Sequence, residues 1–265
     1  MDNASSQDTV VMVLYATEIG GILGLNPYCT RTEVVKRAWY RLRGDEVPFD
    51  CRPTPDQLKI TGGTKPGREF KKSKYTIRDH ARFDELVGGL KARLVEEGRP
   101  DLVQSVPGFI RTEMGKNSES LAVDIAEEEP EIGQCRSMQH SFKRLAWRSA
   151  DGKVEVFISG RIDCRDENGR IVEIKTRLGR RPQVTPTEHA QLQTYLFLAD
   201  EQHGYVIELY DGDKVIANPI QRFDQRWWNE EVIPALISFA DDLATSIKAK
   251  SLVLLSELSS DDICE

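Results

Sequence analysis

The hydrophobic period of the sequence changes near residue 140, and this change is what most limits the folds open to the chain. Before it, apolar residues recur at helical spacing and predict helices over 30–42, 79–97 and 118–129. After it, apolar residues alternate and predict strands over 140–147, 154–162 and 171–174. The remaining chain predicts a helix over 187–198, strands over 204–209 and 214–219, and a helix over about 224–255, interrupted near Pro234. This order predicts an α/β fold with a mixed β-sheet flanked by helices.

The length and composition indicate one soluble globular domain. The chain has 265 residues, of which 39% are hydrophobic and 30% charged, so a single domain over 1–265 is expected. Within it we expect a flexible N-terminus at about 1–9, an irregular insert at about 44–74 with many prolines and glycines, and an acidic tail at about 256–265. No stretch is apolar enough to cross a membrane, and the N-terminus lacks the pattern of a secretion signal.

The cysteines indicate the cellular compartment, and the distribution of charge indicates the kind of partner. Five scattered cysteines make a disulfide framework improbable, so we expect an intracellular protein of the cytoplasm or nucleus, including a virus-encoded one. The formal net charge is −7, but seven basic residues and only two acids lie between Lys65 and Arg82. This basic segment has two interpretations, a solvated surface or a contact with the phosphates of a nucleic acid.

One charged pattern in the predicted strands points to chemistry. Glu173 and Lys175 are two residues apart, so they share one face of their strand, and the turn 166–169 is expected to form a hairpin that brings Asp163 beside them. Two carboxylates and an ammonium group among apolar strand residues are costly unless they bind something. Carboxylate oxygens suit Mg²⁺ or Mn²⁺. The alternative is an exposed hairpin with an ordinary salt bridge between Glu173 and Lys175.

Three sequence blocks resemble one nuclease family. The segment IDCRDENGRIVEIKT, followed by AQLQTYLF, is similar to the core of PD-(D/E)XK nucleases that carry a Q-x-x-x-Y helix. The segments YATEIGGILGLNPYCTRTEVVKRAW and MGKNSESLAVDIAEE resemble the opening motif and a later helix of YqaJ-like and lambda-type viral exonucleases. The blocks occur in the family's order and span residues 15–198. The resemblance implies a restriction-endonuclease-like core and an Mg²⁺-dependent exonuclease acting on double-stranded DNA.

The resemblance also implies roles for individual residues. The catalytic set would be Glu119, Asp163, Glu173, Lys175 and Gln191. The ligands of Mg²⁺, or of Mn²⁺ in its place, would be Glu119, Asp163, Glu173 and the main-chain carbonyl of Ile174. With such a site, the basic segment is interpreted as a DNA contact, and the DNA-binding residues would be Thr17, Arg161, Tyr195, Lys71, Lys72 and Lys74. Thr17 is equally suited to capping a helix, and Tyr195 to supporting the architecture of the site.

The chain departs from the family at several points. No arginine stands shortly before the opening motif, so we expect only a modest preference for a terminal 5′-phosphate. The stretch from Glu119 to Asp163 is longer than in compact members, and the insert before Tyr75 has no counterpart. Cys264 stands alone near the C-terminus, so no iron–sulfur cluster is expected.

Several functional alternatives stay open on the sequence. The favoured one is an exonuclease that acts on double-stranded DNA with a free end, in recombination, repair or viral DNA processing. A homo-oligomer and a recombination partner protein are compatible with it. The others are a structure-specific endonuclease or RNase, and a non-catalytic nucleic-acid-binding module on a degenerate nuclease fold. The complete acid–acid–lysine set favours an enzyme over the non-catalytic module.

Overall fold

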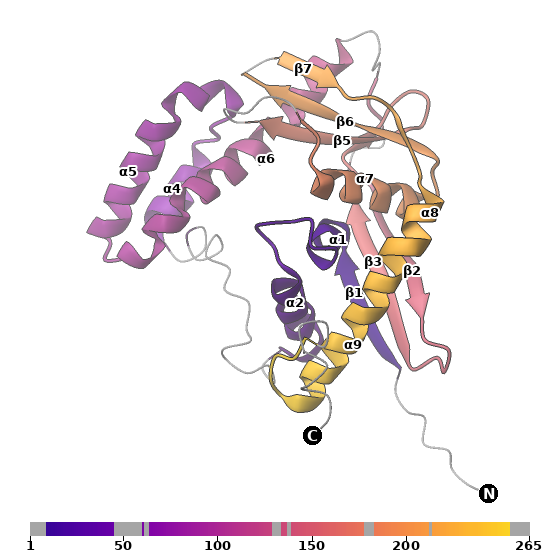
Figure 1. Cartoon of the computed structure of the whole chain (residues 1–265). Helices are drawn as coiled ribbons and strands as arrows, with labels where there is room; N and C mark the ends of the chain where they lie inside the picture. Colours follow the sequence, from indigo (N-terminus) through magenta and orange to yellow (C-terminus); the bar gives the residue numbers. More distant parts are fainter. Residues whose placement is uncertain are drawn as a thin grey trace, which may run out of the picture.

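The computed structural model describes residues 9–44, 60, 64–128, 134–136, 139–177, 183–211 and 214–254. These residues form two β-sheets with helices packed on and between them (Figure 1). Both sheets contain parallel and antiparallel pairs. The predicted α/β class, with mixed sheets flanked by helices, is therefore confirmed. No described helix is both long enough and apolar enough to cross a membrane.

The first sheet has three strands and packs against the first two helices. Its order is β1 (Val10–Tyr15), β3 (Val154–Arg161) and β2 (Ser141–Arg148), with β1 parallel and β2 antiparallel to β3. The chain passes directly from β1 into α1 (Ala16–Ile22), and then into α2 (Arg31–Arg43). Thr30 caps α2 by accepting a hydrogen bond from the N–H of Glu33, as a threonine before a helical pattern predicts.

The second sheet contains the strand that carries Glu173 and Lys175. Its members are β4 (Cys164–Arg165), β5 (Ile171–Arg177), β6 (His203–Tyr210), β7 (Lys214–Ala217) and β8 (Gln221–Arg222). The predicted hairpin of segments 154–162 and 171–174 is wrong, because β3 and β5 belong to different sheets. The chain leaves the first sheet after Arg161, and the turn at Asp166 to Gly169 joins β4 to β5 instead.

Helix α7 (Pro186–Ala199) lies between the two sheets and contacts strands of both. Thr185 and Glu188 form a capping box at its N-terminus. On one side the helix approaches β3 so closely that a Cβ atom at Gly160 would lie 2.8 Å from the ring of Tyr195. On the other side it faces β5 and β6. The positions of α7 residues thus depend on both sheets.

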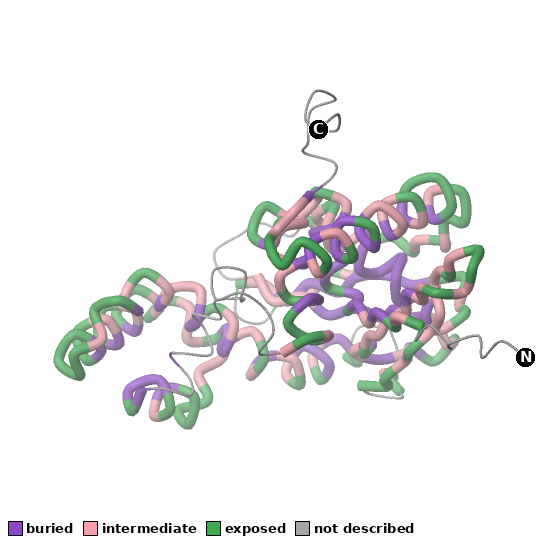
Figure 2. Tube along the Cα trace, turned by 90° about the horizontal axis from the view of Figure 1, so that it is seen from below, coloured by how far each residue is buried: buried purple, intermediate pink, exposed green. Residues whose placement is uncertain are grey.

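A group of helices extends from the second sheet, at the left of Figures 1 and 2. It comprises α4 (Lys65–Lys72), η3 (Ile77–Arg82), α5 (Phe83–Glu96), η4 (Pro100–Ser105) and α6 (Val106–Glu127). The first half of α6 shares a separate apolar core with α4 and α5, whereas its second half packs on the second sheet.

The prediction of an irregular insert over 44–74 is wrong for part of this range, which is helical. Residues 65–72 form α4, which Thr64 caps by accepting a hydrogen bond from the N–H of Gly67. The prolines and glycines of the insert predicted an irregular segment, but Pro66 stands in the first turn of α4, where a proline is compatible with a helix. The rest of the insert at 45–59 and 61–63, the N-terminus at 1–8 and the acidic tail lie outside the described residues.

The C-terminal helical segment packs along the first sheet. It consists of α8 (Gln225–Trp227), a π-helical turn η5 (Trp228–Val232) and α9 (Ile233–Ala249). The interruption expected near Pro234 is this π turn, which precedes the proline. Trp228 is 2% exposed and its ring stacks on Phe197 with centroids 4.2 Å apart, so it anchors this segment in the core.

Candidate active site

Glu173, Lys175 and Asp163 lie together at the edge where the chain enters the second sheet. Glu173 and Lys175 share one face of β5, and the Lys175 ammonium group contacts the Glu173 carboxylate. Asp163 stands just before β4, and its Oδ2 accepts a hydrogen bond from the N–H of Ile174 at 2.8 Å. The antiparallel register of β4 and β5, extended by one residue, places Asp163 opposite Glu173. The three groups meet as expected, although not through the hairpin that the sequence predicted.

Gln191 of α7 connects the members of this cluster. Its Nε2 donates to Glu173 Oε1 at 2.9 Å, and its Oε1 accepts from Lys175 Nζ at 3.1 Å. Nε2 also lies 2.9 Å from the hydroxyl of Tyr195, one turn further along α7. Because one amide contacts both the carboxylate and the ammonium group, the position of α7 determines where these charges lie.

Glu119 approaches the cluster from α6. It is half-buried, and its Oε2 accepts a hydrogen bond from Gln139 Nε2 at 3.3 Å. Burial raises the pKa of Glu119, the charge of Asp163 raises it further, and Arg161 acts in the opposite direction. Glu119 therefore lies within electrostatic reach of Asp163 and of Arg161. Arg161 is exposed at the end of β3.

Glu173 has the least favourable surroundings for a charge. It is 3% exposed, and its Oε2 is buried without any hydrogen-bond partner among the described residues. Burial raises its pKa to about 8, against the opposing effect of Lys175 and with a further rise from Asp163. A carboxylate in this state lacks a positive partner on one oxygen.

The orphaned oxygen is the observation by which an Mg²⁺ site can be tested. No group of three or more His, Cys, Asp or Glu side chains in the described part of the chain is arranged to hold a metal ion. The three predicted carboxylate ligands, Glu119, Asp163 and Glu173, are therefore not gathered into such a group, although Asp163 and Glu173 stand opposite each other. Glu173 Oε2 is an unpaired hard oxygen beside a second carboxylate, which is the donor chemistry that Mg²⁺ requires. Asp163, Glu173 and the carbonyl of Ile174 thus offer the donor chemistry for the ion, whereas Glu119 is not gathered with the other two carboxylates into a metal-holding group.

The remaining predicted DNA-binding residues lie on other elements. Thr17 is exposed in the first turn of α1, where Glu18, and not Thr17, completes the capping interaction with the N–H of Tyr15. Lys71 and Lys72 are exposed on α4, and Lys74 is exposed just after it. The structure therefore does not bring these lysines into the carboxylate cluster.

Two residues that the sequence did not single out complete the surroundings of the site. Arg177 lies two residues after Lys175 on β5 and forms an ion pair with Glu188 of α7 at 2.7 Å. The alternation of the strand was the available signal, since Glu173, Lys175 and Arg177 occupy every second position.

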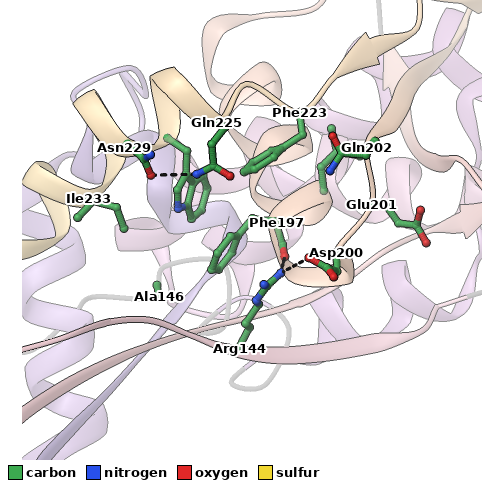
Figure 3. A pocket seen from close by; sticks show the side chains of 12 residues that line it. Arg144, Ala146, Phe197, Asp200, Glu201, Gln202, Phe223, Gln225, Asn229 and Ile233 are labelled. Atoms are coloured by element: carbon green, nitrogen blue, oxygen red, sulfur yellow. Dashed lines mark hydrogen bonds and ion pairs between the residues drawn. The ribbon is translucent and has the colours of Figure 1, made fainter.

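A cavity of about 460 Å³ lies at the C-terminal end of α7 (Figure 3). Phe197 and Trp228 form part of its wall, and its lining includes none of the predicted site residues. Arg144 in this cavity donates to the carbonyl of Phe197 at 2.5 Å and to Asp200 Oδ1 at 3.0 Å. These contacts pair the Arg144 cation within the protein.

Comparisons with known proteins identify no family. No protein-family profile and no curated protein matches the chain. Among solved structures, the alkaline exonuclease LHK-Exo from Laribacter hongkongensis is similar at 12% identity, over 69% of this chain and 95% of that chain, with a TM-score of 0.40. LHK-Exo in complex with dAMP is similar at 13% identity, over 73% of this chain and 88% of that chain, with a TM-score of 0.37. The structure of SSO0001 is similar at 16% identity, over 67% of this chain and 85% of that chain, with a TM-score of 0.41. With TM-scores below 0.5, these likenesses carry no argument about this chain.

The burial of Glu173 predicts a pH-dependent stability in the absence of metal. Folded Glu173 keeps its proton up to pH about 8, whereas the unfolded side chain loses it near 4.5. The folded state therefore binds more protons at this group between these values, and the contribution of Glu173 to the free energy of unfolding should fall as pH rises, by up to about 1.4 kcal/mol per unit. Urea unfolding at pH 5 and pH 7 with a chelator measures this. Glu173→Gln, which stays neutral, should show a shallower slope, and an identical slope would contradict the assignment.

Proposed function

We propose that this protein is a metal-dependent nuclease that hydrolyses phosphodiester bonds of DNA. The observation that carries the proposal is the contact cluster of Asp163, Glu173 and Lys175, with one Glu173 oxygen left unpaired. The resemblance of the three sequence blocks to PD-(D/E)XK nucleases supports the same activity.

An ordinary salt bridge explains the cluster less well. An exposed Glu–Lys pair is solvated and contributes little to stability. Glu173 is buried, and it stands beside a second carboxylate that disfavours its charge. A pair selected for stability alone would not include this repulsion or the unpaired oxygen, because both reduce the stability of the fold.

Mg²⁺, or Mn²⁺ in its place, would be held by Asp163, Glu173 and the carbonyl of Ile174, with Glu119 at the side of α6. When bound, the ion would supply stabilisation of the negative charge on the phosphate and lower the pKa of water. The bound cation would also give Glu173 Oε2 the positive partner that it lacks.

The protein's own residues contribute charge and orientation. The Lys175 ammonium group is placed to stabilise the negative charge that develops on the phosphate, and to orient the attacking water. Gln191 holds this ammonium group through its Oε1 and the Glu173 carboxylate through its Nε2. Tyr195 is 5% exposed and contacts Gln191, so it supports the site from within the core.

The proposed substrate is double-stranded DNA with a free end, as in recombination, repair or viral DNA processing. The purified protein should degrade end-labelled linear duplex in Mg²⁺ and leave covalently closed circular DNA intact. Cleavage of circles would indicate an endonuclease, and cleavage of RNA alone an RNase.

Two variants make this test specific to the site. Glu173→Ala should abolish cleavage, and Lys175→Ala should reduce the rate on the order of 10²-fold while DNA binding in Ca²⁺ persists. Binding without cleavage by the wild type would favour the non-catalytic module.

The exposed lysines of α4 supply a second part of the proposal, a contact with the DNA backbone. Lys71, Lys72 and Lys74 make no ion pair with any described residue, whereas Lys65 on the same helix lies 3.9 Å from Glu69. Unpaired cations are free to neutralise phosphates. We therefore propose that this surface holds DNA outside the cleavage site.

Replacing Lys71, Lys72 and Lys74 together by glutamine should weaken binding about equally for all DNA sequences. It should also flatten the slope of log affinity against log salt by up to ~2.7, at ~0.9 per lost phosphate contact. A salt titration in Ca²⁺ measures both effects. The matched control replaces Lys153, Lys248 and Lys250, which are exposed elsewhere, and so changes the net charge equally. Equal slopes in the two triple variants would refute a DNA contact at α4.

A further inference from the structure

The charged face of β5 continues beyond Lys175 to Arg177, and α7 matches it position by position. Glu188 precedes Gln191 by three residues, so both lie on one side of α7. Arg177 contacts Glu188, while Lys175 and Glu173 contact Gln191. The strand and the helix are therefore joined by two neighbouring sets of polar contacts. One is the Arg177–Glu188 pair, and the other is the contact of Gln191 with Glu173 and Lys175 in the candidate catalytic cluster.

Arg177 uses its guanidinium group to join three elements. Its Nη1 and Nη2 donate to the two carboxylate oxygens of Glu188 at 2.7 and 2.8 Å. Its Nε donates to Oε1 of Glu208 on β6 at 2.5 Å, and Nη2 also donates to the carbonyl of Gln183 at 3.2 Å. A planar fork that is bidentate to one carboxylate fixes orientation as well as distance.

Both carboxylates are built into the fold. Glu208 is fully buried, and its second oxygen accepts from Asn218 Nδ2 at 2.8 Å. Glu188 accepts from the N–H of Thr185 at 2.9 Å, within the cap of α7. Arg177 thus ties the end of β5 to the start of α7 and to β6, directly beside the site.

Without Arg177, Lys175 would face competing carboxylates. Lys175 lies opposite Glu208 in the parallel register of β5 and β6. Burial lowers the pKa of Lys175, but surrounding carboxylates, led by Glu173 and including Glu188, raise it overall, so Glu188 lies within electrostatic reach. Glu188 and Glu208 would attract the ammonium group if Arg177 did not neutralise them.

We propose that Arg177 and Glu188 are positioning residues that reserve Lys175 for Glu173 and Gln191. The pair fixes the start of α7 against β5, and it removes the two carboxylates that compete for the ammonium group. The expected effect of this pair on the rate of cleavage rests on the proposed nuclease function, whereas its expected effect on the positions of Lys175 and Gln191 does not.

The side-chain amide of Gln191 reports the structural consequence directly. In the wild type its Nε2 is held by Glu173 and Tyr195, so its NMR signals should be shifted and its hydrogens protected from exchange. Arg177→Gln should abolish this protection. Arg31→Gln is the matched control, because Arg31 pairs with the buried Asp242 at 2.7 Å between α2 and α9 and touches no site residue. Unchanged Gln191 protection in folded Arg177→Gln would overturn the proposal.

Cleavage kinetics test the functional consequence. Arg177→Gln should lower kcat by 10-fold to 10²-fold with little change in KM, on the scale expected for a misplaced catalytic group. Arg31→Gln should leave kcat unchanged. Adding Glu188→Gln to Arg177→Gln removes one competing carboxylate and should restore part of kcat, whereas a merely structural role predicts no recovery. If Arg177→Gln does not fold, Arg177→Lys should show an intermediate loss that Arg31→Lys lacks.

The two readouts separate the two proposals. A wild type that protects the Gln191 amide but cleaves no nucleic acid would refute the nuclease function and leave the positioning role supported. A wild type that cleaves DNA, with kcat insensitive to Arg177→Gln, would refute the positioning role alone.

Discussion

The burial of the Glu173 carboxylate is the constraint on which the rest of the site depends. A buried carboxylate can ionise only if its charge is compensated, and here the groups around it come from two elements of the fold, β5 and α7. Lys175 comes from the same strand and Gln191 from α7, while one oxygen keeps no partner among the described residues. The architecture around Glu173 can therefore be understood as the support of one unstable group. Stability is given up locally, as is common where chemistry is carried out.

The site forms where the two sheets meet, and α7 is the element common to both. On one side α7 packs so closely on β3 that Gly160 has no room for a side chain beside Tyr195. On the other side it presents Gln191 to β5. Asp163 stands in the short passage between β3 and β4, so its position also depends on both sheets. Small shifts of α7 would thus change the distances between Gln191 and the candidate catalytic groups, and the proposed role of the Arg177–Glu188 ion pair is to limit such shifts.

Sequence periodicity predicted the elements better than their pairing. Alternation located β5 and the common face of Glu173 and Lys175, because side-chain direction in a strand is a local property. The assignment of β3 to another sheet was missed, since pairing depends on contacts between residues distant in sequence. The helix at 65–72 was hidden by Pro66 and Gly67, which are tolerated in its first turn. Arg177 was missed because its role requires Glu188 and Glu208, which lie 11 and 31 residues away.

The central claim is that Glu173 and Asp163 hold a divalent cation that DNA cleavage requires. Crystals soaked with Mn²⁺ test it most directly, because the anomalous signal of the ion shows its position independently of the protein. The account predicts one strong peak in contact with Glu173 Oε2 and the Asp163 carboxylate, and no such peak in Glu173→Gln. A peak elsewhere, unaffected by Glu173→Gln in a protein that still cleaves DNA, would contradict the account.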